Sequence, residues 1–238
     1  MQYAPLALPR RRLLWPVLAL GGMLLAGCAT TRFKEHTKRG FEYQKEKFYS
    51  IAATEFREAV RLKPNDARAH YNLAYVLEEQ GTHTPWGWED MIRMYYESIT
   101  EYREAIRLKP GWAEAHCQLG LVYSNLGPKY DSAMAEFRET LRLKPGFEKA
   151  LGGIKGCSEL ESFIMELDGK HEEAIGVLRE AVKYIPEDGN LYWRWGTILD
   201  KQGRRKEARQ YWEKALKYNR STDDSERKHI RQRLAEPR

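Results

Sequence analysis

The sequence predicts an all-α protein assembled from repeated pairs of helices, and two observations support this. A nine-residue phrase, running from an aromatic residue to a proline, recurs with its apolar residues at helical spacing. Its first copy spans Phe56 to Pro64, and close copies begin at Tyr102 and Phe137. No stretch shows the alternating pattern of a strand. Apolar residues three and four apart form one helix face, so each phrase predicts the end of an amphipathic helix that proline terminates.

Two looser copies of the phrase extend the array to five. One runs from Leu178 to Pro186, and the last begins at Trp212 and has Arg220 where the others have proline. Successive phrase ends are 46, 35, 41 and 34 residues apart. Self-similarity at such a period is typical of a repeat protein.

A first helix is expected before each phrase, with a small residue inside it. These small residues are Gly40, Ala74, Gly120, Ser162 and Gly196. The two helix patterns together resemble the tetratricopeptide repeat (TPR) family over roughly residues 33–220. The resemblance implies a TPR α-solenoid, a right-handed superhelix of about five helix–turn–helix units. The units are expected at about 33–66, 67–112, 113–147, 148–188 and 189–220.

Two repeats are longer than the period. The second has about twelve extra residues after Gly81, and the fourth has about seven around residues 151–154, which most simply extend its first helix. Glycines are expected to close the first helices, at Gly81, Gly127, Gly169 and Gly203.

The insertion in the second repeat contains Trp86 and Trp88. A helix could start at Thr84-Pro85, or the tryptophans could lie in a loop before a helix that begins near Glu89. The two rings either fold back onto the repeats or form a partner-binding patch, since insertions in repeat arrays often fall on the binding face. Our hypothesis is that both contact a partner.

Residues 1–27 predict a signal peptide. They contain no acidic residue, and three arginines at positions 10–12 lead into an apolar run at 13–25. As a helix this run would cover about 20 Å, short of the roughly 30 Å hydrocarbon core of a membrane, so it is interpreted as a signal-peptide core rather than a span.

The run Leu25-Ala26-Gly27-Cys28 resembles the bacterial lipobox. The resemblance implies cleavage before Cys28, which then carries acyl chains such as palmitate. Each buried methylene contributes about 0.8 kcal/mol, so several chains would anchor the protein firmly. Residues 28–32 would form the tether, and Ala29 in place of Asp implies the outer membrane, facing the periplasm. The alternative is an ordinary secretory signal with an incidental cysteine.

Residues 221–238 predict a basic capping helix and tail. Ser221-Thr222 can cap a helix that runs to about Leu234. Residues 204–238 hold 12 basic and 6 acidic residues, in a chain with 40 basic and 34 acidic residues. Repeat arrays need a polar end to cover their last apolar face, so a solvated cap is favoured. The alternative is a patch that contacts anionic lipid or an acidic polymer.

The sequence shows no motif for catalysis or for binding a cofactor or a metal. His70 and His116 occupy equivalent repeat positions and are expected to pack. Cys117 and Cys157 are expected as two buried thiols, with a disulfide as the alternative. We therefore expect no enzyme, and the export signal argues against a nucleic-acid partner.

Binding is what the resemblance implies instead, because TPR first helices line a concave groove. The groove residues implied for this chain are Phe41, Arg68, Tyr71, Asn72, Tyr75 and Gln118. Phe41, Tyr71 and Tyr75 would form an aromatic wall suited to peptide capture, or they would pack against neighbouring repeats. The carboxylate clamp of TPR co-chaperones is not expected, because only Asn72 matches its five places.

The sequence therefore predicts a noncatalytic, membrane-anchored scaffold that binds envelope proteins or peptides. Small TPR lipoproteins resemble pilotin-like proteins that assist secretin or type IV pilus assembly, which we favour. The alternatives are an adaptor for peptidoglycan hydrolases and an accessory factor in exopolysaccharide export.

Overall fold

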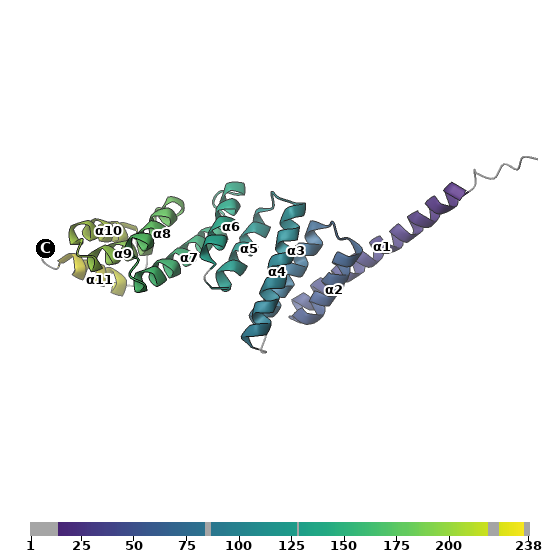
Figure 1. The fold of residues 1–238 in the computed structure, drawn as a ribbon, viewed down its shortest axis with the longest axis horizontal. Helices are drawn as coiled ribbons and strands as arrows, with labels where there is room; N and C mark the ends of the chain where they lie inside the picture. The colour runs from purple at the N-terminus through teal and green to yellow at the C-terminus, as the bar shows by residue number, and fades with distance from the viewer. Residues whose placement is uncertain (1–13, 84–86, 128, 219–223, 236–238) are drawn as a thin grey trace, which may run out of the picture. The chain divides into compact units, whose positions relative to one another are not determined.

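The structure is a computed structural model that describes residues 14–83, 87–127, 129–218 and 224–235, without the side chains of residues 14–28, 224–226 and 229. Every regular element in these ranges is an α-helix (Figure 1), as predicted. The chain divides into two compact bodies, an N-terminal body of residues 1–108 and a C-terminal body of residues 109–238.

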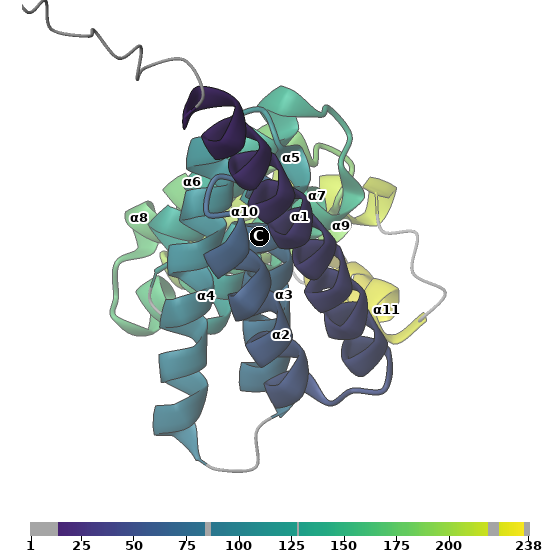
Figure 2. The same cartoon turned by 90° about the vertical axis from the view of Figure 1, so that its right-hand side faces the viewer.

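The N-terminal body contains two helical hairpins (Figure 2). Helix α1 (Leu14–Lys45) pairs with α2 (Tyr49–Leu62), and α3 (Ala67–His83) pairs with α4 (Trp88–Leu108). Helices α2 and α3 also contact each other, which joins the two hairpins.

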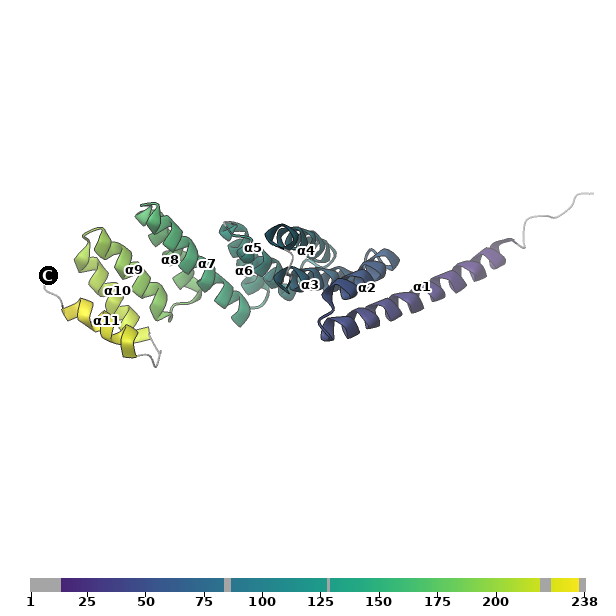
Figure 3. The ribbon, with the colours of Figure 1, turned by 90° about the horizontal axis from the view of Figure 1, so that it is seen from below.

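The C-terminal body repeats this pattern and adds a last helix. Its helices are α5 (Ala113–Asn125), α6 (Tyr130–Leu143), α7 (Glu148–Leu167), α8 (His171–Tyr184), α9 (Gly189–Lys201), α10 (Arg205–Tyr218) and α11 (Asp224–Ala235). Figure 3 shows α11 beside α10, where Ile230 is buried. This arrangement agrees with the predicted capping helix, whose cap at Ser221-Thr222 lies outside the described residues.

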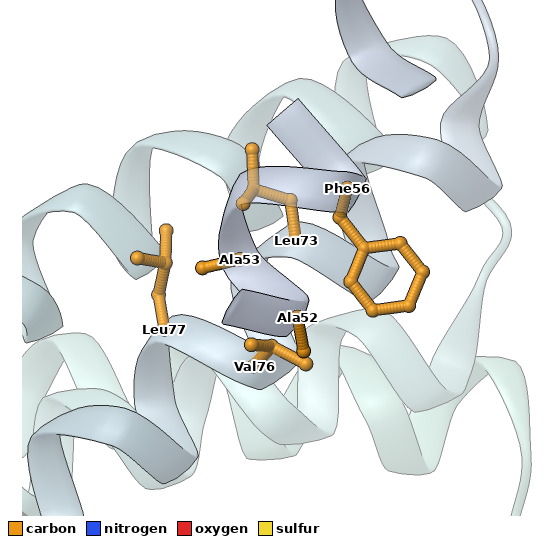
Figure 4. Close-up of a cluster of buried hydrophobic side chains, with 6 residues drawn as sticks. All are labelled: Ala52, Ala53, Phe56, Leu73, Val76 and Leu77. Carbon is orange, nitrogen blue, oxygen red and sulfur yellow. The ribbon is translucent and has the colours of Figure 1, made fainter. Parts of the chain in front are cut away.

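The core of each body forms where the phrase helices meet the first helices. Figure 4 shows one such cluster between α2 and α3. Its members are Ala52, Ala53, Phe56, Leu73, Val76 and Leu77. All six side chains are apolar and buried, as expected for an amphipathic face that packs on another.

The small residue of the first helix makes room for the large residue that opens the phrase. A Cβ on Gly40 would lie 2.7 Å from the ring of Phe56, and one on Gly196 would lie 2.5 Å from Trp212. In the third repeat Phe137 lies against both Gly120 and Gly153. These approaches explain the glycine at this position in the first, third and fifth repeats, because a side chain on Gly40, Gly120 or Gly196 would displace a buried ring.

Glycine closes three first helices as predicted. Gly127, Gly169 and Gly203 have φ between 76° and 87°, in the left-handed region that lacks a penalty only for glycine. The first repeat has Lys47 at this place, with φ 64°. The prediction for Gly81 was wrong: it lies inside α3, where a Cβ would come within 3.2 Å of Tyr95.

The two long repeats lengthen their helices. The described part of the insertion lengthens α3 to 17 residues and α4 to 21 residues, where the third repeat has helices of 13 and 14 residues. Helix α4 begins at Trp88, one residue before the start expected near Glu89. The 20 residues of α7 confirm that the fourth repeat has an extended first helix.

Residues 28–32, expected as a tether, are helical and continue α1. Within the described part of the chain, none of the helices combines the length and the apolar character that crossing a membrane requires.

Candidate functional site

Each body has its own candidate surface on the exposed side of a first helix, α1 in the N-terminal body and α7 in the C-terminal body. Within each first helix, the residue after the small residue occupies the same repeat position. On α1 this residue is Phe41, and on α7 it is Phe163. We call the exposed residues at and around these two positions the α1 face and the α7 face.

The α1 face combines an aromatic ring with lysines. Phe41 is 48% exposed, and its ring meets the buried ring of Phe56 edge-on at 5.2 Å. A shallow depression here is lined by Phe41 together with Lys34, Lys38, Lys45 and Glu42. Only Lys38 among these lysines has a described ion pair, at 3.7 Å from Glu42. The face can therefore offer an apolar contact in surroundings with an excess of positive charge.

The other two members of the predicted aromatic wall are largely occupied by packing. Tyr71 contacts the ring of Tyr102 at 5.5 Å, and Tyr75 packs against the α2–α3 core. Burial, followed by a hydrogen bond to Glu79, raises the pKa of Tyr75 to about 12. Both rings remain partly exposed on α3, so each one contributes to packing and to the surface.

The remaining predicted groove residues differ in exposure. Arg68 is exposed and Asn72 is half-buried on α3. Gln118 is buried in α5, where its side-chain oxygen accepts a hydrogen bond from Lys149. Gln118 is thus engaged inside the C-terminal body, whereas the other two lie at the surface of the N-terminal body.

Of the two tryptophans in the insertion, Trp86 lies outside the described residues. Trp88 is 68% exposed at the first residue of α4. It is not packed back onto the repeats, so its large apolar surface remains available.

The α7 face was missed by sequence reasoning, which derived no groove positions for the fourth repeat. Four apolar side chains that are 41–71% exposed follow one stripe of the helix. They are Leu160, Phe163, Ile164 and Leu167. Their spacing of three, four and seven residues was visible in the sequence, but periodicity alone does not distinguish an exposed stripe from a buried one.

A charged network borders the α7 face. Arg194 lies over the ring of Phe163 at 5.1 Å, donates to the Ser162 hydroxyl at 2.7 Å, and pairs with Glu166 at 3.3 Å. Lys201 pairs with the same Glu166 carboxylate, whose side chain is almost buried. Burial lowers the pKa of Arg194. These contacts fix the charged side chains beside the stripe and place Arg194 over one ring, while all four apolar residues remain 41–71% exposed.

The cysteines do not form a reactive site. Cys117 and Cys157 are both buried and do not form a disulfide, which agrees with the expected two thiols. Burial raises the pKa of the Cys157 thiol to about 11, so it is protonated near neutral pH. The side chain of Cys28 lies outside the described residues.

Two further features bear on function. Among the described residues, no group of three or more histidine, cysteine, aspartate or glutamate side chains is placed to hold a metal ion. Helix α11 exposes Lys228 and Arg231, while Arg233 lies 3.6 Å from Asp200 of α9. Its basic residues are therefore divided between internal pairing and the surface.

Family models match much of the chain. A TPR repeat model matches residues 42–81 and 95–127. Tetratricopeptide repeat models match residues 113–147 and 189–221. The chain belongs to the tetratricopeptide repeat family. It is thus an all-α TPR solenoid of the family whose members serve as protein-interaction scaffolds.

Solved TPR structures share this fold. A crystal structure of MamA is 16% identical, with a TM-score of 0.55, and the match covers 87% of this chain and 98% of MamA. MamA from Desulfovibrio magneticus RS-1 is 18% identical over 81% of this chain and 97% of that one, with a TM-score of 0.52. YrrB, described as a TPR protein with an unusual peptide-binding site, is 16% identical over 87% and 99%, with a TM-score of 0.53. A search of curated proteins found no match.

Proposed function

We propose that this protein is a noncatalytic scaffold that binds a segment of another envelope protein along the first helices of its TPR units. A lipid on Cys28 holds it at the bacterial outer membrane, facing the periplasm. The observation that carries the binding role is the α7 face, where four large apolar side chains of one helix are exposed to water.

Exposure of these side chains is unfavourable unless a partner covers them. Burying apolar surface contributes about 25 cal/mol per Å², and contiguous exposed apolar patches mark interaction sites. One member of the stripe occupies a repeat position that is exposed in another repeat, since Phe163 is equivalent to Phe41. Ile164, in contrast, is exposed at a position where the equivalent Val76 and Ile198 are buried. The stripe therefore exposes apolar surface that other repeats cover, as expected for a surface that a partner covers.

The sequence before the first repeat supports a position close to the membrane. Cys28 and Gly40 lie on the same helix, α1, and a rise of 1.5 Å per residue separates them by about 18 Å. A scaffold held this close to the membrane could contact a protein complex that assembles at the membrane surface. We therefore propose a pilotin-like role in assembling a secretin or a type IV pilus.

The partner is tested by crosslinking tagged, full-length protein in living cells and identifying the retained proteins by mass spectrometry. The variant Phe163→Ser/Leu167→Ser should lose the partner. Tyr96→Ser is the matched control, because Tyr96 is equally exposed but lies on the second helix α4. A Trp86→Ala/Trp88→Ala variant tests the insertion in parallel.

The class of protein that the crosslinking experiment retains distinguishes the candidate functions. A secretin or pilus component that is lost with the α7 variant supports the proposal. Recovery of cell-wall hydrolases would instead indicate an adaptor for these enzymes. Recovery of proteins for polysaccharide export would instead indicate that the basic helix α11 is the contact surface. Equal recovery by the parent and the α7 variant would remove the α7 face from the proposal.

The anchor is tested separately with Cys28→Ser. This variant should move from the outer-membrane fraction to the soluble periplasmic fraction and should no longer incorporate labelled palmitate. Retention in the membrane fraction without label would contradict lipidation at this residue.

A further inference from the structure

Two buried histidines at equivalent repeat positions have the same pair of partners. In the second repeat, His70 Nδ1 lies 2.6 Å from the Glu101 carboxylate, and Nε2 lies 2.9 Å from the backbone oxygen of Pro64. In the third repeat, His116 Nδ1 lies 2.7 Å from Glu136, and Nε2 lies 3.1 Å from the backbone oxygen of Pro110.

The chemistry of these partners fixes the number of protons. A backbone carbonyl only accepts hydrogen bonds, and so does an ionised carboxylate. A neutral imidazole has one N–H and can satisfy only one of them. Both bonds therefore form only when the histidine–glutamate pair holds one additional proton, as an imidazolium beside a carboxylate.

We propose that the His116–Glu136 pair is a proton-linked clamp that fastens α5 to α6 and loosens as the pH rises, and that the His70–Glu101 pair is a clamp of the same geometry that fastens α3 to α4. Each clamp also fastens the first helix to the proline that ended the preceding phrase. A single proton thus holds three segments of chain together within its own body.

The charges around His116 favour the protonated clamp. The hydrogen bond to Glu136 raises the pKa of His116, and the charge of Glu139 raises it further, whereas burial opposes them. Glu139 is itself bonded to Arg142 on α6. On α5, Glu114 pairs with Lys144. Negative charge therefore dominates around the ring.

The surroundings of His70 have the same pattern. Glu104 lies one turn along α4 from Glu101, and it is bonded to Arg107. The hydrogen bond from Arg107 lowers the pKa of Glu104, and the neighbouring His70 makes a smaller contribution in the same direction. Asp66 at the start of α3 accepts hydrogen bonds from the backbone of Arg68 and Ala69 and does not contact the ring through any described bond.

The first repeat provides an internal contrast. His36 also lies 2.7 Å from a carboxylate, that of Glu55. Arg39 shares that carboxylate at 3.1 Å and also lies 3.0 Å from His36 Nδ1. The arginine already neutralises Glu55, so this pair does not have the two-acceptor arrangement of the other clamps.

The sign of the pH effect follows from the raised pKa of His116. Its stabilisation is fully present below the ordinary histidine pKa of about 6.5 and is lost as the pH rises through the higher folded value. Within that window, each bound proton changes the folding equilibrium constant about tenfold per pH unit.

The clamps bear on the proposed function because α3 and α5 are first helices, and α3 carries Tyr71 and Tyr75. Loosening a clamp would free a first helix that is proposed to bind the partner, and this effect on binding rests on the proposed scaffold role. The clamps themselves are tested without a partner, so their failure would leave the scaffold proposal standing, and the reverse is also true.

The direct test is a pH titration of the histidine ring signals in the full-length protein by NMR. His70→Gln and His116→Gln assign the two signals. The His116 signal should titrate above the ordinary histidine pKa of about 6.5. Glu136→Gln should shift the His116 titration down, whereas the matched control Glu139→Gln should shift it less.

Denaturant unfolding gives a second readout. Between about pH 5.5 and about pH 8.5, the folding constant of the parent should fall more than that of the His116→Gln variant. Equal falls, or a His116 signal that titrates at or below about pH 6.5, would overturn the proposal. If the variant does not fold, the ring titration of the parent decides.

Discussion

The α1 face and the α7 face occupy the same repeat positions but present opposite chemistry. Around Phe41 the neighbours are Lys34, Lys38 and Lys45. Around Phe163 the neighbours are Leu160, Ile164 and Leu167, and the nearby cations share the Glu166 carboxylate. One repeat scaffold therefore offers a positively charged aromatic surface in one body and an apolar surface in the other.

This difference shows how a repeat array acquires specificity. The buried positions of the two first helices are constrained by packing, as at Gly40 against Phe56. The outward positions are free of that constraint and are available for a partner. Ile164 even exposes an apolar side chain where the equivalent Val76 and Ile198 are buried. The fourth repeat is thus incompletely covered in a way the other repeats are not.

The largest expected effect is a loss of affinity for the partner, which shows whether the α1 face or the α7 face binds it. A segment of the captured partner, made as a peptide, should lose about 2 kcal/mol or more of affinity with Phe163→Ala, the loss typical of a buried aromatic anchor. Titrations at low and high salt should give the same affinity if the segment lies on the α7 face. A steep salt dependence, together with sensitivity to Phe41→Ala, would assign it to the α1 face instead.

Replacing a glycine by alanine should have opposite effects on stability in α1 and in α7. Gly40→Ala should destabilise the protein by about 1–3 kcal/mol, because the new methyl group would meet the buried ring of Phe56. Gly156→Ala on α7 should stabilise it by about 0.5–1 kcal/mol, since nothing lies within 4 Å and alanine favours a helix. Urea unfolding measures both, and equal signs would contradict the packing described here.

The turns that close the two helices provide a smaller contrast. Lys47 and Gly169 both adopt the left-handed conformation. Lys47→Gly should stabilise the protein by up to about 1 kcal/mol, and Gly169→Ala should destabilise it by about 1–2 kcal/mol. Thermal unfolding of the two variants checks this. If Lys47→Gly lowers the melting temperature, contacts of the lysine side chain outweigh its backbone strain.

The smallest effects concern the ion pairs beside each face. Lys38→Gln should change stability by less than about 0.5 kcal/mol, because its pair with Glu42 is solvated on both sides. Lys201→Gln should cost slightly more, since its partner Glu166 is almost buried, although Arg194 still pairs with it. Urea titrations at two salt concentrations compare them. A larger loss of stability for Lys38→Gln than for Lys201→Gln would contradict the description of the first ion pair as solvated and of the second as partly buried.

Much of the fold was predictable because the same sequence pattern recurs in each repeat, so each copy supports the interpretation of the others. The phrase residues Phe56, Phe137 and Trp212 are all buried against a small residue of a first helix, as their recurrence indicated. Gly81 shows where this reasoning fails. It matches the closing glycines in spacing, but the insertion that follows continues the helix past it.

The candidate site was less predictable. Phe41, Tyr71 and Tyr75 were expected to act together, but only Phe41 is largely exposed, because the neighbouring core takes up part of both tyrosines. Leu160 and Phe163 were not anticipated at all. A helical apolar stripe has the same sequence pattern whether or not another helix covers it.

The sequence by itself determined the helices, their order, the repeat register and the turns at Gly127, Gly169 and Gly203, because these depend on local spacing, proline and glycine. It also set out the signal peptide and Cys28 as predictions. Only the tertiary structure decided which apolar and titratable side chains are exposed or paired. It left the stripe of Phe163 uncovered and gave His70 and His116 two acceptors each. The reason is that burial and hydrogen-bond partners come from segments distant in the chain, which local sequence patterns do not specify.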